Sequence, residues 1–164
     1  VSVTHDQTEA LTMSDRVAIM HEGRLVQVAT PEDLYRRPVN AYVASFLGEA
    51  NLLPVSDGAL IDDSTGQIVD ATAVLRPEDM TVLAPEETAT AWAVEGRVRL
   101  VSFQGSRYRL ELTTAYGRKV VASLSPSTDL SALAVGSVVR LACRNPERVH
   151  LIEAVATAAI PVPV

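Results

Sequence analysis

The order of apolar and polar positions changes character near residue 50. Before it, apolar segments stand between residues that favour helix starts and turns, such as Asp6 with Glu9 three positions later, Thr30 before Pro31, and the Glu22-Gly23 pair. These patterns predict a helix over residues 6–14, a hairpin of strands over 16–20 and 24–28, a helix from Thr30 that ends before Pro38, and a helix capped by Asn40 that ends at Gly48.

After residue 50 the helical spacing disappears, and short apolar runs alternate with glycine-containing turns. Tyr108, Leu110 and Leu112 alternate with polar residues, as in a half-buried strand. The expected strands are Leu52–Val55, Ala59–Asp62, Gln67–Val69, Ala73–Arg76, Thr81–Leu83, Ala93–Val101, Tyr108–Leu112, Lys119–Ser123, Val138–Cys143 and Arg148–Leu151. The sequence therefore predicts a mainly β protein, with a small closed barrel after a small α/β N-terminal piece and a tail over residues 156–164.

Composition narrows the range of partners. The 164 residues carry 14 basic and 20 acidic side chains, for a net charge of -6. Binding to nucleic acid needs clustered basic residues, so we expect no nucleic acid partner. The single cysteine, Cys143, excludes an internal disulfide and is typical of a reducing compartment. No apolar run is long enough for a membrane span.

His5 is the candidate for chemistry, because it lies between a β-prone segment and the start of a helix. That position would expose the ring beside a helix N-terminus, where an anion such as phosphate is favoured. The alternative is a histidine that only caps or packs. On spacing alone, the second interpretation is favoured.

The other polar groups have simpler interpretations. Asp57, Asp62 and Asp63 are interpreted as turn residues rather than cation ligands. Glu86 and Glu87 are interpreted as a surface pair in a loop that begins at Pro85. Trp92 is expected in the barrel core or at its edge. Four arginines are expected on a solvated barrel face rather than on a nucleic acid platform: Arg97, Arg99, Arg107 and Arg109.

The segment Val3-Thr4-His5-Asp6-Gln7-Thr8-Glu9-Ala10-Leu11, with its continuation Ser14–Met20, closely resembles the H-loop of ATP-binding subunits of ABC importers. The resemblance continues in order through His21–Pro31, Leu34–Pro38, Val43–Gly48 and Asn51–Leu53. Later residues resemble the transport-associated OB (TOBE) domain of these subunits, on the segments Leu75–Asp79, Gly96–Val98, Gln104–Ser106, Ala134–Gly136 and Val149–Leu151.

The resemblance implies a domain organisation and a set of roles. Residues 1–50 would be the end of a nucleotide-binding domain and residues 51–155 an OB-like TOBE domain. His5 would contact the γ-phosphate of ATP and help to orient the attacking water. Arg76, Pro77 and Glu78 would form a regulatory-domain motif. The intact subunit would use ATP and Mg²⁺ at the cytoplasmic face of the bacterial inner membrane.

The same resemblance implies partners: a second copy of the subunit, the membrane subunits, and indirectly an extracytoplasmic solute-binding protein. The solute itself is suggested only by the segment Phe46–Asn51, which resembles importers of spermidine and putrescine.

One departure from the family pattern is decisive. The sequence has no Gly-x-x-x-x-Gly-Lys-Ser/Thr phosphate loop, no glycine-rich signature segment and no strand that ends in paired acids. We therefore expect a C-terminal fragment that neither binds nor hydrolyses ATP alone. We also expect it to self-associate through Val1–Thr4 and Val17–Met20, or to leave its first residues disordered. The alternative is a stand-alone TOBE-type module that binds a small ligand or a protein.

Overall fold

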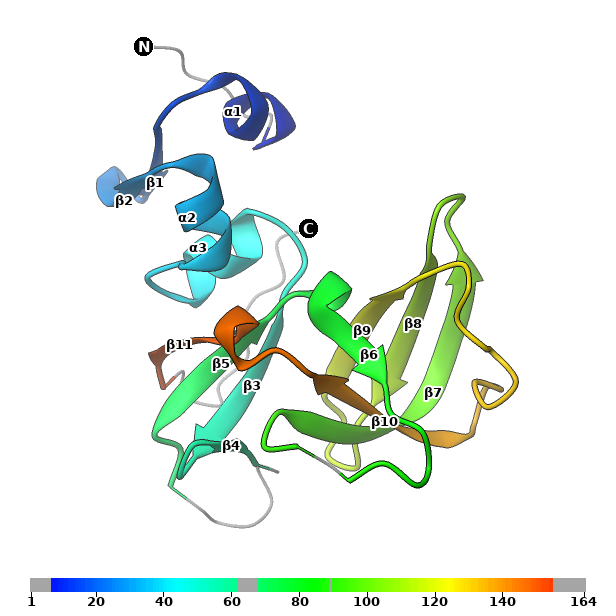
Figure 1. The fold of residues 1–164 in the computed structure, drawn as a ribbon. Coiled ribbons are helices and arrows are strands. Elements are labelled where there is room, and N and C mark those ends of the chain that lie inside the picture. The colour runs from blue at the N-terminus through cyan, green and yellow to red at the C-terminus, as the bar shows by residue number, and fades with distance from the viewer. Residues whose placement is uncertain (1–6, 62–67, 89, 155–164) are drawn as a thin grey trace. The chain divides into compact units, whose positions relative to one another are not determined.

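The computed structural model describes residues 7–61, 68–88 and 90–154 of the chain (Figure 1). It contains two compact units, one within the first 49 residues and one formed by Ala50–Val155. Some residues and segments discussed above lie outside the described residues: Val1–Thr4, His5, Asp6, Asp62, Asp63, Gln67 and the tail 156–164.

The first unit contains the elements that its capping residues predict. They are α1 (Gln7–Met13), β1 (Val17–His21), β2 (Arg24–Ala29), α2 (Pro31–Arg36) and α3 (Ala41–Phe46). The Thr30 side chain accepts a hydrogen bond from the Asp33 amide, and the Asn40 side chain accepts one from the Val43 amide. Both residues are therefore N-caps, as expected from the sequence.

A hairpin turn and one glutamine hold this unit together. Glu22 and Gly23 both have positive φ, 48° and 75°, which suits the tight turn between β1 and β2. The Gln27 amide donates to the Arg37 carbonyl at 3.0 Å and accepts from the Val39 amide at 3.0 Å. Gln27 thereby joins the hairpin to the segment between α2 and α3. The buried side chains of this unit's cluster are Ile19, Leu34, Val43 and Leu47.

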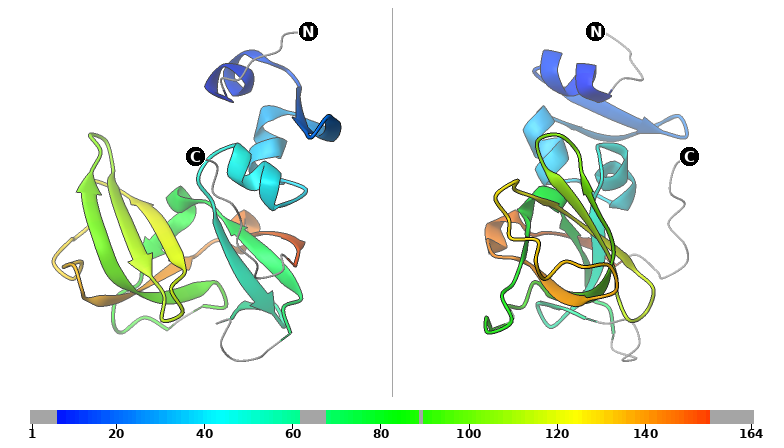
Figure 2. Two further views of the ribbon diagram at one scale, coloured as in Figure 1. Left: turned by 180° about the vertical axis from the view of Figure 1, so that it is seen from behind. Right: turned by 90° about the vertical axis from the view of Figure 1, so that its right-hand side faces the viewer.

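The second unit is built from two antiparallel sheets (Figures 1 and 2). One has the order β11-β5-β3-β4, with β3 (Asn51–Ser56), β4 (Ala59–Leu60), β5 (Ala71–Leu75) and β11 (His150–Glu153). The other has the order β6-β10-β7-β8-β9, with β6 (Met80–Val82), β7 (Ala93–Phe103), β8 (Tyr108–Thr113), β9 (Lys119–Leu124) and β10 (Val138–Cys143). The five-stranded sheet curls into a nearly closed barrel, which confirms the mainly β, OB-like fold class.

One strand expectation is wrong. Ile68 and Val69 are not in a strand, although an extended segment Gln67–Val69 was expected. Ile68 is largely exposed, and the chain joins the sheet only at Asp70, whose amide donates to the Val55 carbonyl at 2.9 Å. Without a neighbouring strand these residues gain no ladder hydrogen bonds.

Most other strands differ from their expected limits by one or two residues. The strand expected over Ala59–Asp62 is β4, which ends at Leu60. The strand expected over Ala73–Arg76 is β5, which begins at Ala71 and ends at Leu75, so that Arg76 lies outside it. The last strand begins at His150 because Pro146–Arg148 forms a short 3-10 helix, η3, which is capped by the Asn145 side chain.

The core of the second unit lies between its two sheets. Fourteen buried residues form one cluster, with Leu53 and Leu75 from the four-stranded sheet and Leu110 and Leu141 from the five-stranded one. One buried polar side chain, Asn51, pairs with the backbone of β9. Its amide donates to the Val121 carbonyl at 2.8 Å and accepts from the Val121 amide at 2.7 Å. Asn51 therefore extends hydrogen bonding from one sheet to the other.

Of the helices in the described residues, none has the length and apolar character that crossing a bilayer requires.

Candidate functional site

His5 lies outside the described residues, so its role rests on the sequence alone. The neighbouring hairpin is described. Ile19 points into the small core, whereas Met20 and Leu25 are each 61% exposed. His21 stacks on Tyr42 with 3.8 Å between the ring centroids, and the Tyr42 hydroxyl donates to the Met20 carbonyl at 3.5 Å. The hairpin therefore has both a packed face and an exposed apolar one.

The segment Arg76-Pro77-Glu78 forms a corner between the two sheets. Arg76 is only 4% exposed and precedes the 3-10 helix η2 (Pro77–Asp79), which leads from β5 to β6. Pro77 is buried and Glu78 is exposed. The Asp79 amide donates to the Arg76 carbonyl at 3.0 Å, which closes the turn. Of the three side chains Glu78 is therefore the exposed one, and the regulatory role of the segment stays a prediction.

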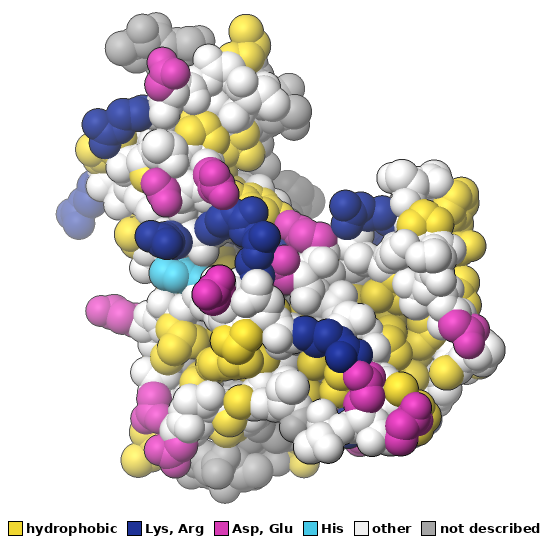
Figure 3. Space-filling model, viewed as in Figure 1, with side chains coloured by type: hydrophobic (Ala, Val, Ile, Leu, Met, Phe, Trp, Pro, Cys, Tyr) yellow, Lys and Arg dark blue, Asp and Glu magenta, His cyan; other side chains and the backbone are white. Residues whose placement is uncertain are grey.

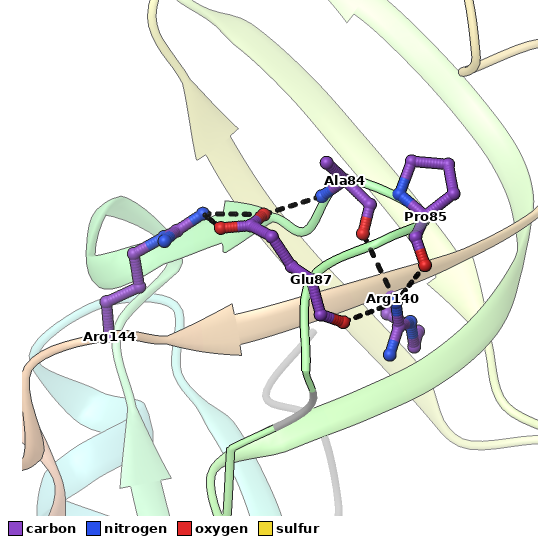
Figure 4. A network of polar contacts seen from close by, with 5 residues as sticks. All are labelled: Ala84, Pro85, Glu87, Arg140 and Arg144. Atoms are coloured by element: carbon purple, nitrogen blue, oxygen red, sulfur yellow. Dashed lines mark hydrogen bonds and ion pairs between the residues drawn. The ribbon is translucent and has the colours of Figure 1, made fainter.

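Two arginines hold the loop that leads from β6 to β7 (Figure 4). Arg140 lies in β10, and Arg144 directly follows that strand. Nη2 of Arg140 donates to the carbonyl oxygens of Ala84, Pro85 and Glu87 at 3.2, 3.0 and 2.9 Å. The Glu87 carboxylate accepts from the Ala84 amide at 2.7 Å and from Arg144 at 2.6 and 2.9 Å. Because Nη2 carries two N–H groups, one of them is shared between two of the three carbonyl oxygens.

These contacts lower the pKa of Glu87 below its usual range, first through the hydrogen bond from the Ala84 amide and then through the one from Arg144. The sequence interpretation placed Glu86 and Glu87 at the surface, and the structure shows Glu86 exposed and Glu87 partly exposed, but it did not foresee that Glu87 is paired with an arginine. No local pattern reveals this pairing, because Glu87 is held by an arginine 57 positions later.

A groove with a volume of about 670 Å³ lies in the second unit. Its walls come from β3, β4 and the following Ile61, from the first half of β7, and from the turn between β8 and β9. The charged side chains that line it are Arg97, Arg99, Arg118 and Glu95. A space of this size can hold a small organic molecule.

Backbone features set the positions of the three arginines. Arg99 stands at a β-bulge, because Val98 and Leu100 pair with consecutive residues of β8. Nη1 of Arg97 donates to the Gly136 carbonyl at 2.6 Å. The amide of Arg118 donates to the Thr114 hydroxyl at 3.2 Å, within the turn between β8 and β9.

Gly96 brings two strands close together beside the groove. A Cβ atom at this position would lie 3.0 Å from the Leu112 Cβ and 3.1 Å from the Thr113 carbonyl oxygen. Any larger residue would push β7 away from β8, so glycine is required here by packing rather than by its φ angle.

The sequence foresaw part of this arrangement. The expected exposure of Arg97, Arg99 and Arg107 is confirmed, whereas Arg109 is half-buried and pairs with Glu111 at 2.8 Å. Arg118 was missed. Its sequence neighbourhood, Tyr116-Gly117-Arg118-Lys119, indicated only a turn, and the groove forms through strands that are distant in sequence.

Two other expectations concern acidic and aromatic residues. Asp57 lies in the turn between β3 and β4, with φ of 50° before Gly58 at 74°, which confirms it as a turn residue. Trp92 is half-buried against the barrel core, as expected. Within residues 7–61, 68–88 and 90–154, no three His, Cys, Asp or Glu side chains gather as a metal site would need. Figure 3 shows basic side chains interspersed with acidic ones on the face in view.

This geometry defines a small antiparallel β-barrel domain that carries a groove. Residues 73–154 match the family model of the TOBE domain, and the chain belongs to this family.

Relatives share more of the chain than this domain. The chain is 39% identical to a spermidine/putrescine import ATP-binding protein of Clostridioides difficile over 68% of the chain and 35% of that protein. It is 41% identical to an Fe(3+) ions import ATP-binding protein of Pseudomonas fluorescens over 86% of the chain and 42% of that protein. It is also 39% identical to an uncharacterized ABC transporter ATP-binding protein of Escherichia coli over 78% of the chain and 35% of that protein.

The resemblance to ATP-binding subunits of ABC importers is thereby confirmed. The chain spans about a third of the length of the curated spermidine/putrescine import relatives that it matches. Among solved structures, the molybdate-binding protein ModG with molybdate bound matches with a TM-score of 0.43 and 12% identity, over 49% of this chain and 60% of that one.

Proposed function

We propose that the chain is the C-terminal part of an ATP-binding subunit that powers solute import through an ABC transporter. The match to the ferric ion import protein of Pseudomonas fluorescens carries this proposal. A match over 86% of the chain is longer than the whole of Ala50–Val164, so it includes part of the first unit as well as the barrel. The similarity therefore extends beyond the TOBE domain.

In this proposal the two units have different tasks. The first is the end of the nucleotide-binding domain and carries His5. The second is the regulatory TOBE domain. In the intact subunit, ATP closes a pair of nucleotide-binding domains, hydrolysis reopens them, and the cycle drives solute through the membrane subunits at the cytoplasmic face of the inner membrane. An extracytoplasmic binding protein delivers the solute.

Polyamine is the solute we propose, because spermidine/putrescine import proteins recur among the relatives. The match to a ferric ion import protein makes ferric ion the competing candidate.

We expect the chain alone to provide no site for ATP and Mg²⁺. It has no phosphate loop, and its described residues bring together no set of metal-ligating side chains. His5 would contribute to the ATP site only within the longer subunit, where it would contact the γ-phosphate and orient water. We therefore expect no saturable ATP binding and no ATP hydrolysis by the 164-residue chain. Turnover by this chain that His5→Ala abolishes would contradict the proposal.

The stronger test uses the subunit with its complete nucleotide-binding domain. We expect His5→Ala to lower kcat for ATP hydrolysis by about 10²-fold or more, the typical contribution of a group that positions or moves a proton, while ATP affinity is retained. His21→Ala is the matched control, because His21 stacks on Tyr42 within the hairpin and should leave kcat unchanged. A loss of ATP affinity with unchanged kcat would show that His5 serves binding rather than hydrolysis.

A stand-alone module is the second candidate, and it is favoured by the groove that lies wholly within Ala50–Val155. Such a module would bind a small ligand or a protein without ATPase activity. The coding sequence upstream of Val1 distinguishes the two candidates. An in-frame phosphate loop and signature segment support the import subunit, whereas a start codon directly before Val1 supports the module.

A further inference from the structure

We propose that the groove of the second unit binds an amphipathic organic anion, a carboxylate or phosphate carried on an apolar body. This inference goes beyond the proposed function, because it assigns a ligand class to a site that import by the parent subunit does not require. It rests on the charge of the groove, on its size and apolar lining, and on the way one of its arginines is held.

The charge of the groove is opposite to that of the chain. Three arginines and one glutamate line it, although the whole chain has a net charge of -6. Within the part of the chain that the structure describes, the side chain of Arg99 is exposed and makes no hydrogen bond or ion pair to another residue. A guanidinium group offers five donors in a planar fork, which matches the oxygens of a carboxylate or phosphate. Arg99 is therefore the group best placed to bind the anion.

The groove also has an apolar lining. Leu60 at the end of β4, Ile61 after it, and Val138, which pairs with Arg97 across β10 and β7, contribute partly exposed hydrocarbon to the same space that Arg97 and Arg99 line. Tyr116, which is 51% exposed, also lines the groove. Burial of an apolar body against these side chains would add to the attraction of the anionic head.

The volume of the groove argues against a simple inorganic anion. About 670 Å³ is in the range of sites for organic molecules, and a lone tetrahedral oxyanion would leave most of it filled with water. Such an ion would also make no use of the apolar lining. The ligand should therefore combine one charged group with a body of roughly aromatic-ring size or larger.

One of the three arginines is held before any ligand arrives. The Gly136 carbonyl restrains the Arg97 side chain at 2.6 Å, whereas the backbone of Arg99 lies at a bulge and that of Arg118 ends a tight turn that includes Gly117 with φ of 82°. Fixed donors lose less conformational entropy on binding than free ones do, which raises affinity.

The test is a titration of the ¹⁵N-labelled 164-residue chain, monitored by amide chemical shifts, with three probes. Phenyl phosphate has both the anion and the apolar body, inorganic phosphate has only the anion, and phenol has only the apolar body. We expect phenyl phosphate to shift the amides of residues 95–99 and 114–118 saturably, with an affinity at least about tenfold higher than that of either other probe. Equal affinity for inorganic phosphate, or shifts away from these residues, would overturn the proposal.

Two matched variants locate the anion. Arg99→Ala should weaken phenyl phosphate binding by about tenfold, in the range expected for loss of a charged hydrogen bond. Arg107→Ala removes the same charge from the exposed turn between β7 and β8, outside the groove, and should leave the affinity unchanged. Equal weakening by both variants would mean that only general charge attraction acts, which would overturn the site. The assay contains no ATP, so its outcome is independent of whether the import proposal holds.

Discussion

The two units of the chain differ in the size of their buried cores. Among the described residues of the first unit, the buried cluster has four side chains, and Met13, Met20 and Leu25 are 79%, 61% and 61% exposed. The second unit buries fourteen residues in one cluster. A segment of 49 residues is near the size at which a single core no longer suffices for stability, whereas the second unit has the size of an ordinary small domain.

The interactions that stabilise the two units also differ in how far apart their partners lie in the sequence. The first unit is defined by caps and turns that act over three or four residues, such as Thr30 on Asp33. The second depends on pairs that are far apart in sequence, such as Asn51 with Val121, 70 positions away. Local signals alone stabilise short helices only marginally, because most helical stability comes from tertiary packing. The comparison therefore indicates that the second unit is self-sufficient and that the first requires added contacts.

The largest expected effect comes from separating the units. We expect residues 50–155 alone to unfold in one cooperative thermal transition, followed by circular dichroism. Residues 1–49 alone should show no cooperative transition, because their four-residue core does not offset the loss of conformational entropy on folding. A sharp transition in residues 1–49 at low, non-associating concentration would contradict this difference between the units.

A matched pair of core substitutions sharpens the comparison. Leu34 and Leu110 are both fully buried, one in each unit. We expect Leu110→Ala to destabilise the second unit by about 3 kcal/mol through lost burial and a cavity, measured by urea denaturation. Leu34→Ala should leave that transition unchanged. The only tryptophan, Trp92, packs on the core of the second unit, so its fluorescence reports on that unit.

The outcome that would contradict this expectation is a parallel shift of the Trp92 transition in both variants. It would mean that the two units unfold together and that their cores are energetically coupled.

The same difference in sequence distance explains what the sequence could predict. The N-caps Thr30 and Asn40 and the hairpin turn at Glu22-Gly23 were predictable, because each acts on its immediate neighbours. The alternation of apolar and polar residues around Leu110 predicted the limits of β8 to within one residue. Such alternation depends only on which face of the strand is buried.

What the sequence could not predict depends on partners from distant strands. Nothing around Asn51 indicates that its amide pairs with β9, and Ile68 looked like a strand residue although no partner strand lies beside it. The groove likewise requires β4, β7 and the turn between β8 and β9 to come together. The sequence therefore predicted that Arg97 and Arg99 are exposed, but it did not predict the groove that they share.

The smallest expected effect is in the loop between β6 and β7, where Glu87 is a solvent-accessible group. Its pKa is lowered from an ordinary value of 4.5, so the carboxylate form stabilises the fold above that pH. This stabilisation is lost as the pH falls through the lowered pKa, because protonation removes the acceptor for the Ala84 amide and Arg144. Glu87→Gln should therefore lower the Tm of the second unit slightly at pH 7.

The deficit should fade as the pH falls below 4.5 and disappear once the pH lies below the lowered pKa, where the native carboxyl group is also neutral. Glu86→Gln is the control, because its exposed side chain lies one position away, and its Tm should follow that of the unmodified chain throughout. A deficit for Glu87→Gln that persists unchanged at low pH would assign the effect to side-chain packing. In that case the contact between this loop and Arg144 would stabilise the second unit through packing rather than through charge. The caps of the first unit differ from it, because they act only through hydrogen bonds between near neighbours.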